Sequence, residues 1–152
     1  MSIWVLSARS EFNLVGVNSQ LVQVARKALG WSDVDFAVTD GVRTLEEQRA
    51  LVAAGASRTM ESKHLTGDAI DLVPFVGDNL RWEMPVICTM AAAVRAAAVD
   101  LGVKLRWGGA WDLEFTATIG APIDIVDGYT KRRLANNRTV FIDGPHFELI
   151  GE

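Results

Sequence analysis

The sequence predicts an α+β fold, a single domain in which helices pack on a small, mostly antiparallel sheet that carries a zinc site. Three observations support this fold class. The chain has 152 residues, of which 49% are hydrophobic, and this is enough to bury one hydrophobic core without stabilising cross-links such as disulfides. Apolar residues at helical spacing alternate with short apolar runs that are typical of strands. No repeat, low-complexity tract or linker interrupts residues 1–152, so we expect one domain and no separate binding module.

The first elements are a helix and a strand. Asn18 or Ser19 can cap a helix that runs through Leu29, and Gly30 is its expected stop. Phe36–Thr39 has the composition of a short strand.

A second helix begins at a capping box, in which Thr44 and Glu47 are three residues apart, and Gly55 is its expected end. Arg43 immediately precedes this helix, on the turn from strand to helix, where a side chain can point into a cleft. A solvent-exposed surface arginine is the simpler alternative.

The middle of the chain contains a predicted apolar strand that is interrupted by one charged residue. Ala69–Val73 is an apolar run broken by Asp71, and strand alternation places Ile70 and Leu72 on the face opposite to Asp71. A lone carboxylate in such a strand is costly to bury unless it is paired or bound to a metal. Asp71 is therefore a candidate functional residue.

A long alanine-rich helix follows. Pro85 opens it and Leu101 ends it, before Gly102 as the C-terminal signal. We expect this helix to lie in the core. Cys88 within it is the chain's single cysteine, which excludes an intrachain disulfide and favours a buried, inert thiol.

The last third of the chain is harder to interpret. Lys104–Trp107 has the pattern of a strand, Ile123–Leu134 that of a helix weakened by Gly128, and Thr139–Ile142 that of another strand. The basic run Lys131-Arg132-Arg133 is interpreted as a solvated helix face rather than a substrate or membrane contact.

The chain contains only two histidines, and both lie in short polar segments beside carboxylates. Two imidazoles and one carboxylate, from His64, Asp71 and His146, make up the three-ligand set of a catalytic zinc site with an open fourth position for water. Such an enzyme also needs a proton acceptor, and Asp143 is the natural candidate. A structural hydrogen bond between histidine and carboxylate is the alternative for each histidine.

Two motifs carry a family resemblance. Ser62-x-His64-x-x-Gly67-x-Ala69-x-Asp71 and Asp143-x-x-His146-Phe147-Glu148-Leu149 resemble the signatures of the VanY/VanX-like zinc peptidases, peptidase family M15. The resemblance is strongest to phage endolysins of the L-alanyl-D-glutamate peptidase type. It extends over nearly the whole chain, including Gly41-Val42-Arg43-Thr44 and Arg106-Trp107-Gly108-Gly109-x-Trp111.

The resemblance implies roles for individual residues. The implied Zn²⁺ ligands are His64, Asp71 and His146. Asp143 would be the catalytic base, and Arg43 would hold a substrate carboxylate or stabilise the oxyanion. Ser62 and Trp107 would contact substrate. Relatives usually carry an acidic residue where this chain has Ala110, so any substrate or second-metal contact at that position stays open.

The expected function is zinc-dependent hydrolysis of the peptide stem of bacterial peptidoglycan, at the L-Ala–D-Glu bond, by a phage endolysin in host lysis. A D,D-carboxypeptidase or D-Ala-D-Ala dipeptidase would perform the same chemistry at another bond. A non-catalytic wall-binding or phage structural protein is a third alternative, which Asp143 disfavours because a structural site needs no base. Glu148 is expected either to orient a ligand histidine or simply to solvate a strand end.

Charge and targeting signals bear on partners. The net charge of −4 does not favour nucleic acid as a partner. Met1–Ser10 has no apolar core of signal-peptide length, and we expect no membrane insertion. The expectation is therefore a monomer that stays in the host cytoplasm until a holin or lysis releases it to the periplasm and cell wall.

Overall fold

The frame of the fold is an antiparallel sheet in the order β1-β2-β5-β4, with β3 paired to the far end of β2. The computed structural model describes residues 4–151, so Met1 to Ile3 of the segment tested for a signal peptide lie outside it. The strands are β1 (Phe36–Asp40), β2 (Ala69–Val76), β3 (Asn79–Leu80), β4 (Leu105–Trp107) and β5 (His146–Leu149). The helices are α1 (Ala8–Asn13), α2 (Ser19–Trp31), α3 (Leu45–Ala53), α4 (Met84–Leu101) and α5 (Pro122–Ala135), with short 3₁₀ helices η1 (Lys63–Thr66) and η2 (Phe115–Ala117).

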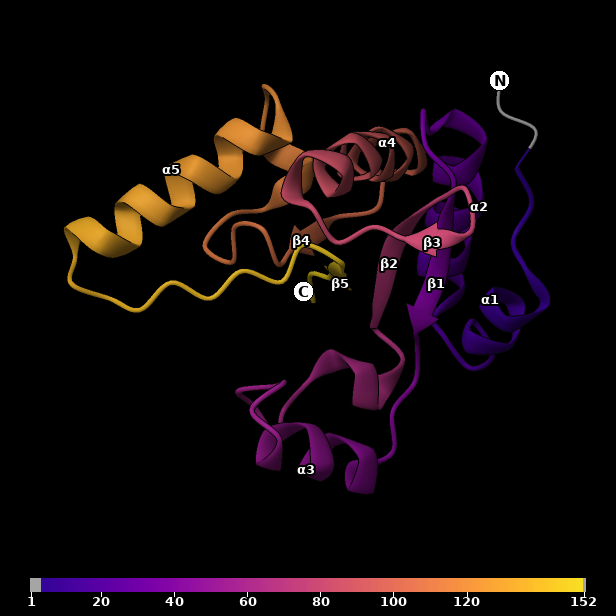
Figure 1. Cartoon of the computed structure of the whole chain (residues 1–152), viewed down its shortest axis with the longest axis horizontal. Coiled ribbons are helices and arrows are strands. Elements are labelled where there is room, and N and C mark those ends of the chain that lie inside the picture. Colours follow the sequence, from indigo (N-terminus) through magenta and orange to yellow (C-terminus); the bar gives the residue numbers. More distant parts are fainter. Residues whose placement is uncertain (1–3, 152) are drawn as a thin grey trace.

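The core lies between the sheet and the helices packed against it, chiefly α2 and α4 (Figure 1). Helix α4 packs on α2, on α5 and on β2, while α3 lies beyond the end of β1 and β2 and α5 projects to the left. Ile70 and Leu72 of β2 are fully buried in this core, as their alternation predicts. The α+β fold class is confirmed.

Several predicted boundaries are also confirmed. The capping box of Thr44 and Glu47 is complete, with the Thr44 Oγ1 accepting from the Glu47 N–H and the Glu47 carboxylate accepting from the Thr44 N–H. Helix α4 ends before Gly102, which adopts a left-handed φ of 70°. Helix α5 contains Gly128 without a break. The short helix α1 was not predicted.

The prediction that Gly30 ends its helix is wrong. Gly30 remains helical and α2 continues to Trp31. The chain leaves the helix at Ser32, which has extended φ and ψ and whose Oγ donates to the Val34 carbonyl at 2.6 Å. A side-chain turn therefore stops this helix instead of a glycine.

The predicted strand over 139–142 is also wrong, because within residues 4–151 this segment pairs with no other strand. Side chains take up its carbonyl groups instead. The Arg133 Nε donates to the Thr139 oxygen at 2.8 Å, and the Trp111 Nε1 donates to the Phe141 oxygen at 3.1 Å. The segment is thus an extended support between α5 and β5.

Helix α4 is a core helix, as expected. Its buried face includes Met90 and Val94, both with no exposed surface. Among residues 4–151 it is the one helix long and apolar enough to cross a membrane, a property that core helices share. Cys88 is buried on this helix; burial, followed by the charge of Asp127, raises the pKa of its thiol to about 11. This thiol is therefore unreactive.

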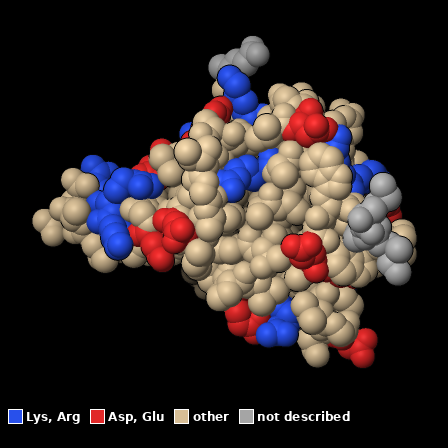
Figure 2. Space-filling view, turned by 90° about the horizontal axis from the view of Figure 1, so that it is seen from above, with Lys and Arg blue, Asp and Glu red and all other residues tan. Residues whose placement is uncertain are grey.

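Charged residues of both signs are interspersed over the face seen in Figure 2, with a group of basic and acidic side chains at the left end, over α5. Part of this mixture is paired: Arg132 of α5 holds the Asp112 carboxylate through two hydrogen bonds, of 2.7 and 2.9 Å.

Candidate metal centre and active site

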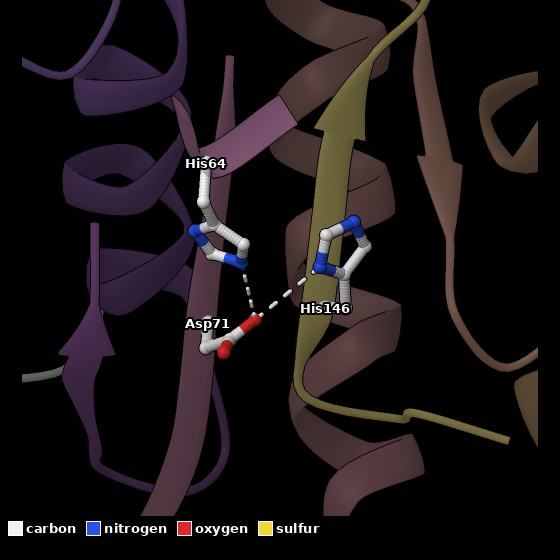
Figure 3. Close-up of side chains that lie close together, drawn as sticks. All are labelled: His64, Asp71 and His146. Carbon is white, nitrogen blue, oxygen red and sulfur yellow. Dashed lines mark hydrogen bonds and ion pairs between the residues drawn. The ribbon is translucent and has the colours of Figure 1, made fainter. Parts of the chain in front are cut away.

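Strand pairing brings together two of the three candidate ligands. In the antiparallel register of β2 and β5, Asp71 lies directly opposite His146. His64 comes from η1, immediately before β2, and points toward the same place (Figure 3). Gly67 allows this approach: it has a φ of +78°, and a Cβ there would meet the Gly16 carbonyl oxygen at 2.7 Å.

The three side chains converge on one point. The Asp71 Oδ1 lies 3.2 Å from the His64 Nε2 and 3.4 Å from the His146 Nδ1 (Figure 3). One potential ligand atom from each residue lies within 4.8 Å of the other two. The predicted convergence of His64, Asp71 and His146 is therefore present in the fold.

Each imidazole has a partner on its other nitrogen. The His64 Nδ1 lies 2.7 Å from the Gly41 carbonyl oxygen, which can only accept, so this nitrogen carries a proton; in the neutral ring Nε2 then carries the lone pair, and in the charged ring it donates to Asp71. The His146 Nε2 lies 2.8 Å from the Glu148 Oε1. Both lone pairs of the neutral rings are thus directed at Asp71, as in metal sites where a second group fixes the tautomer.

Glu148 therefore does more than solvate a strand end. It is only 9% exposed, bonds His146, and lies 3.6 Å from the Lys63 ammonium. Burial alone would raise the pKa of Glu148, but the hydrogen bond from His146 and the positive charges around it lower the pKa. Its carboxylate is thus charged and able to orient the ring of His146.

The electrostatics favour a cation at this point. Burial alone would raise the pKa of Asp71, yet hydrogen bonds from His146 and His64 hold it well below its usual range. Burial alone would lower the pKa of His146, but its bonds to Asp71 and Glu148 raise it to about 9. In the metal-free protein a proton on His146 therefore compensates the carboxylates, and a divalent metal would take the place of that proton.

Asp143 stands beside this cluster on the segment leading into β5. Its N–H donates to the Gly108 oxygen at 2.9 Å, and its carbonyl accepts from the His146 N–H at 3.0 Å. A Cβ at Gly108 would meet the Asp143 oxygen at 2.1 Å, so only glycine allows this approach. The sequence suggested just a turn at Gly108, without its role in placing Asp143.

The charge state of Asp143 suits proton transfer. Burial, followed by the negative charge of Asp71, raises the pKa of Asp143 from 3.8 to about 6. Positive charge on His146, His64 and Arg43 opposes this shift. A carboxyl group with such a pKa can exchange a proton near neutral pH.

Arg43 is not a surface residue, since its side chain is only 11% exposed. Its Nε donates to the Asp40 Oδ2 at 2.5 Å, its Nη1 to the Gln48 Oε1 at 3.0 Å, and its Nη2 lies 3.4 Å from the Asp71 Oδ2. Gln48 is fully buried and also donates to Ser57 and Thr59. No sequence pattern indicates this network around Arg43.

Ser62 lies at the cleft, whereas Trp107 lies in the core. Ser62 caps η1 by accepting from the His64 N–H at 3.3 Å, and it lines the cleft. Trp107 is fully buried, packs against Phe115 with the ring planes tilted by 35°, and donates from Nε1 to the Gly144 oxygen at 2.6 Å. The prediction that Trp107 contacts substrate is therefore wrong, because a core residue has no surface to offer.

A cleft of about 390 Å³ opens beside the cluster and is lined by Arg43, Ser62, Trp111, Asp143 and His146, among others. Trp111, rather than Trp107, lines this cleft, and its ring centre lies 5.0 Å from that of His146. A larger surface depression, of about 690 Å³, lies between the start of α2 and the end of β5 and contains none of the three candidate ligands.

Comparisons with known proteins agree with this geometry. Residues 1–150 match the family model of the phage L-alanyl-D-glutamate peptidase. The L-alanyl-D-glutamate peptidase of Escherichia phage T5 is 36% identical over 107 residues, which span 68% of this chain and 78% of that protein. The Listeria phage A118 peptidase of the same name is 35% identical over 107 residues, covering 68% of this chain and 37% of that longer protein.

A solved structure is similar over nearly the full length. It is the crystal structure of the Serratia marcescens L-Ala D-Glu endopeptidase ChiX, with 37% identity and a TM-score of 0.73 over 96% of this chain and 90% of that chain. The match to the family model covers almost every residue, including both metal motifs. The chain belongs to the phage L-alanyl-D-glutamate peptidase family.

Proposed function

We propose that this protein is a zinc peptidase that cleaves the L-Ala–D-Glu bond in the peptide stem of bacterial peptidoglycan, as a phage endolysin. The observation that carries the proposal is the convergence of the His64, Asp71 and His146 ligand atoms beside Asp143, a carboxyl group with a raised pKa. Family membership and the names of the relatives support the same bond. Two imidazoles whose tautomers are fixed by a second partner, together with one carboxylate, are a typical ligand set for zinc.

The residues divide the reaction among themselves. Bound zinc would supply a Lewis acid that polarises the scissile carbonyl and acidifies water. Asp143 takes a proton from water as the water oxygen adds to the carbonyl carbon of L-Ala. The same carboxyl group then gives that proton to the amide nitrogen of D-Glu as the C–N bond breaks. The products are a carboxylate on L-Ala and a free amine on D-Glu.

Arg43 supports this chemistry from the wall of the cleft. Its guanidinium is fixed by Asp40 and Gln48 and faces the cluster, so it is placed to stabilise negative charge on the carbonyl oxygen. Ser62 holds the start of η1 and thereby the backbone of His64. We also propose that Ser62, which lines the cleft, contacts the substrate directly.

The experiment is digestion of purified peptidoglycan followed by mass spectrometry of the fragments. New amino termini at D-Glu are expected, and they should disappear when a chelator removes the metal. Release of terminal D-Ala instead would indicate a carboxypeptidase or dipeptidase. Unchanged peptidoglycan in the presence of zinc would favour a non-catalytic wall-binding protein.

We further propose that the enzyme acts as a monomer and reaches the wall from the host cytoplasm through a lesion made by a holin. Its proposed substrate lies outside the inner membrane, so passage across that membrane is required. Expression alone should leave Gram-negative cells intact, and co-expression with a holin should lyse them. Lysis by the chain alone would contradict this route.

A further inference from the structure

Two arginines on the rim of the cleft form no close ion pair within residues 4–151, although Arg133 is near enough to Asp112 to help lower the pKa of that carboxyl group. Arg58 and Arg133 both line the cleft, and among residues 4–151 neither forms an ion pair. The chain has 19 acidic and 15 basic residues, so carboxylates are available elsewhere on the surface. Arg132, the neighbour of Arg133, is fully engaged with Asp112. Within α5 the two neighbouring arginines therefore differ: Arg132 is paired with Asp112, whereas Arg133 lines the cleft without an ion pair.

Both arginines rest on the same extended segment, 138–142. The Arg58 Cζ lies 4.7 Å from the centre of the Phe141 ring, an arrangement that fixes the guanidinium plane and leaves its N–H edge free. The Arg133 Nε is held by the Thr139 oxygen, which leaves its terminal nitrogen atoms free. The segment therefore pre-organises two sets of donors at one end of the cleft.

A line of stacked side chains joins this end to the metal cluster. Phe141 stacks on Trp111 with ring centres 6.3 Å apart and an interplanar angle of 23°. Trp111 in turn packs against His146. Arg58 thus connects to His146 through two aromatic side chains and forms no ion pair with Asp71, so we assign it to substrate binding rather than to the chemical step.

The other charges of the cleft are already engaged or do not neutralise these arginines. Arg43 is held by Asp40, and Lys63 lies beside Glu148. Glu61 also lines the cleft, but within residues 4–151 it forms no ion pair with either arginine. A negatively charged ligand group would therefore meet two guanidinium groups that have no close ion pair at this end of the cleft.

We propose that Arg58 and Arg133 form a carboxylate-binding subsite for the part of the stem peptide that begins at D-Glu. The inference rests on the proposed function. The carboxyl group of L-Ala is consumed in the scissile bond, so a free carboxylate can come only from D-Glu onward. Two sources share this chemistry: the carboxyl group of D-Glu that does not continue the chain, and a carboxylate further along the stem.

The test uses the zinc-loaded enzyme and a soluble acyl-L-Ala-γ-D-Glu-L-Lys peptide. Arg58→Gln and Arg133→Gln should each lower kcat/KM by roughly tenfold or more, the typical worth of a hydrogen bond to a charged group. Arg132→Gln is the matched control on the same helix and should change kcat/KM by less than about twofold. Unchanged melting temperatures would show that the variants fold.

Two further peptides identify the carboxylate. One has the free D-Glu carboxyl group amidated, and the other carries a C-terminal amide. Wild-type enzyme should lose activity on whichever peptide lacks the recognised carboxylate, and on that peptide the two variants should match wild type. The effects of removing the arginine and of removing the carboxylate would then not add, and this distinguishes direct recognition of the carboxylate by the arginine from a structural role of the arginine.

The outcomes separate the two proposals. Variants that equal wild type on every peptide, or that lose the same factor on all three, would overturn the subsite while leaving the bond assignment intact. A zinc-loaded wild-type enzyme that cleaves none of the peptides at L-Ala–D-Glu would overturn the proposed bond and the subsite with it.

Discussion

Replacing Asp143 with asparagine should separate stability from activity. Burial, followed by the charge of Asp71, raises the pKa of Asp143 from 3.8 to about 6. Between about pH 4 and pH 6 the folded protein therefore holds a proton that the unfolded chain has released. The stability gained from that proton is complete below this window and lost as the pH rises through it. Above the window, the ionised carboxylate costs the metal-free fold about 3 kcal/mol, at about 1.4 kcal/mol per pKa unit.

Asparagine keeps the shape of the side chain and removes the charge. At pH 8 the metal-free Asp143→Asn variant should therefore be more stable than wild type by roughly 1–3 kcal/mol, since burying the amide offsets part of the gain. Its melting temperature should rise by roughly 3–10 °C. Urea unfolding of chelator-treated proteins between pH 5 and pH 8 measures this difference, which should widen up to about pH 7 and then level off.

The zinc-loaded variant should retain its metal but lose activity on the stem peptide by roughly 10²–10⁴-fold. Asp78→Asn, in the exposed turn between β2 and β3, is the control and should alter neither property. Near wild-type activity in Asp143→Asn would place the base elsewhere, with Glu148 the first candidate. A variant that is no more stable at pH 8, or a difference that is equal at every pH, would refute the electrostatic argument.

Three other predictions test the metal site and its wall. Purified wild-type protein should carry one zinc ion per chain and His64→Ala substantially less, as measured by metal analysis; full occupancy in the variant would contradict the ligand assignment. His146 has a pKa of about 9 and must lose its proton to bind metal. The apparent zinc affinity should therefore rise roughly tenfold per pH unit between about pH 7 and 8.5. Zinc titrations that show no pH dependence would contradict the role of His146 as a ligand. Arg43→Lys should lower kcat/KM by roughly tenfold or more with a smaller effect on melting temperature, because lysine keeps the charge but cannot reproduce the planar contacts to Asp40 and Gln48; unchanged turnover would remove Arg43 from the mechanism.

The candidate metal-binding residues were predictable because they are unusual in their sequence context. Asp71 interrupts an apolar strand, and both histidines of the chain occur in short polar segments. Such residues are costly to bury without a partner, so the residue pattern alone indicates that each of them has one. Strand alternation predicts that Asp71 faces away from Ile70 and Leu72, and the β2–β5 register, which the sequence does not give, places His146 opposite Asp71.

Residues whose roles depend on contacts distant in sequence were not predictable. Trp107 lies beside Gly108 and Gly109 in a motif that suggested the cleft, yet its ring fills the core. The pattern of the motif is the same whether its tryptophan faces inward or outward. Likewise, the extended segment over 139–142 has the composition of a strand, but within residues 4–151 it pairs with no other strand, and the side chains of Arg133 and Trp111 satisfy it instead.

The residues proposed for the chemical step and those proposed for substrate binding lie on different kinds of segment. His146 is on the paired strand β5, and Asp143 is tied to it by two backbone hydrogen bonds, one to Gly108 and one from His146 itself. The candidate ligands and the proposed base therefore share a rigid frame, as hydrolysis would require because small displacements of reacting groups are costly. The rim, in contrast, is built from unpaired segments around Arg58 and Phe141. Substitutions there can change which stem carboxylate is held without moving the groups that break the bond.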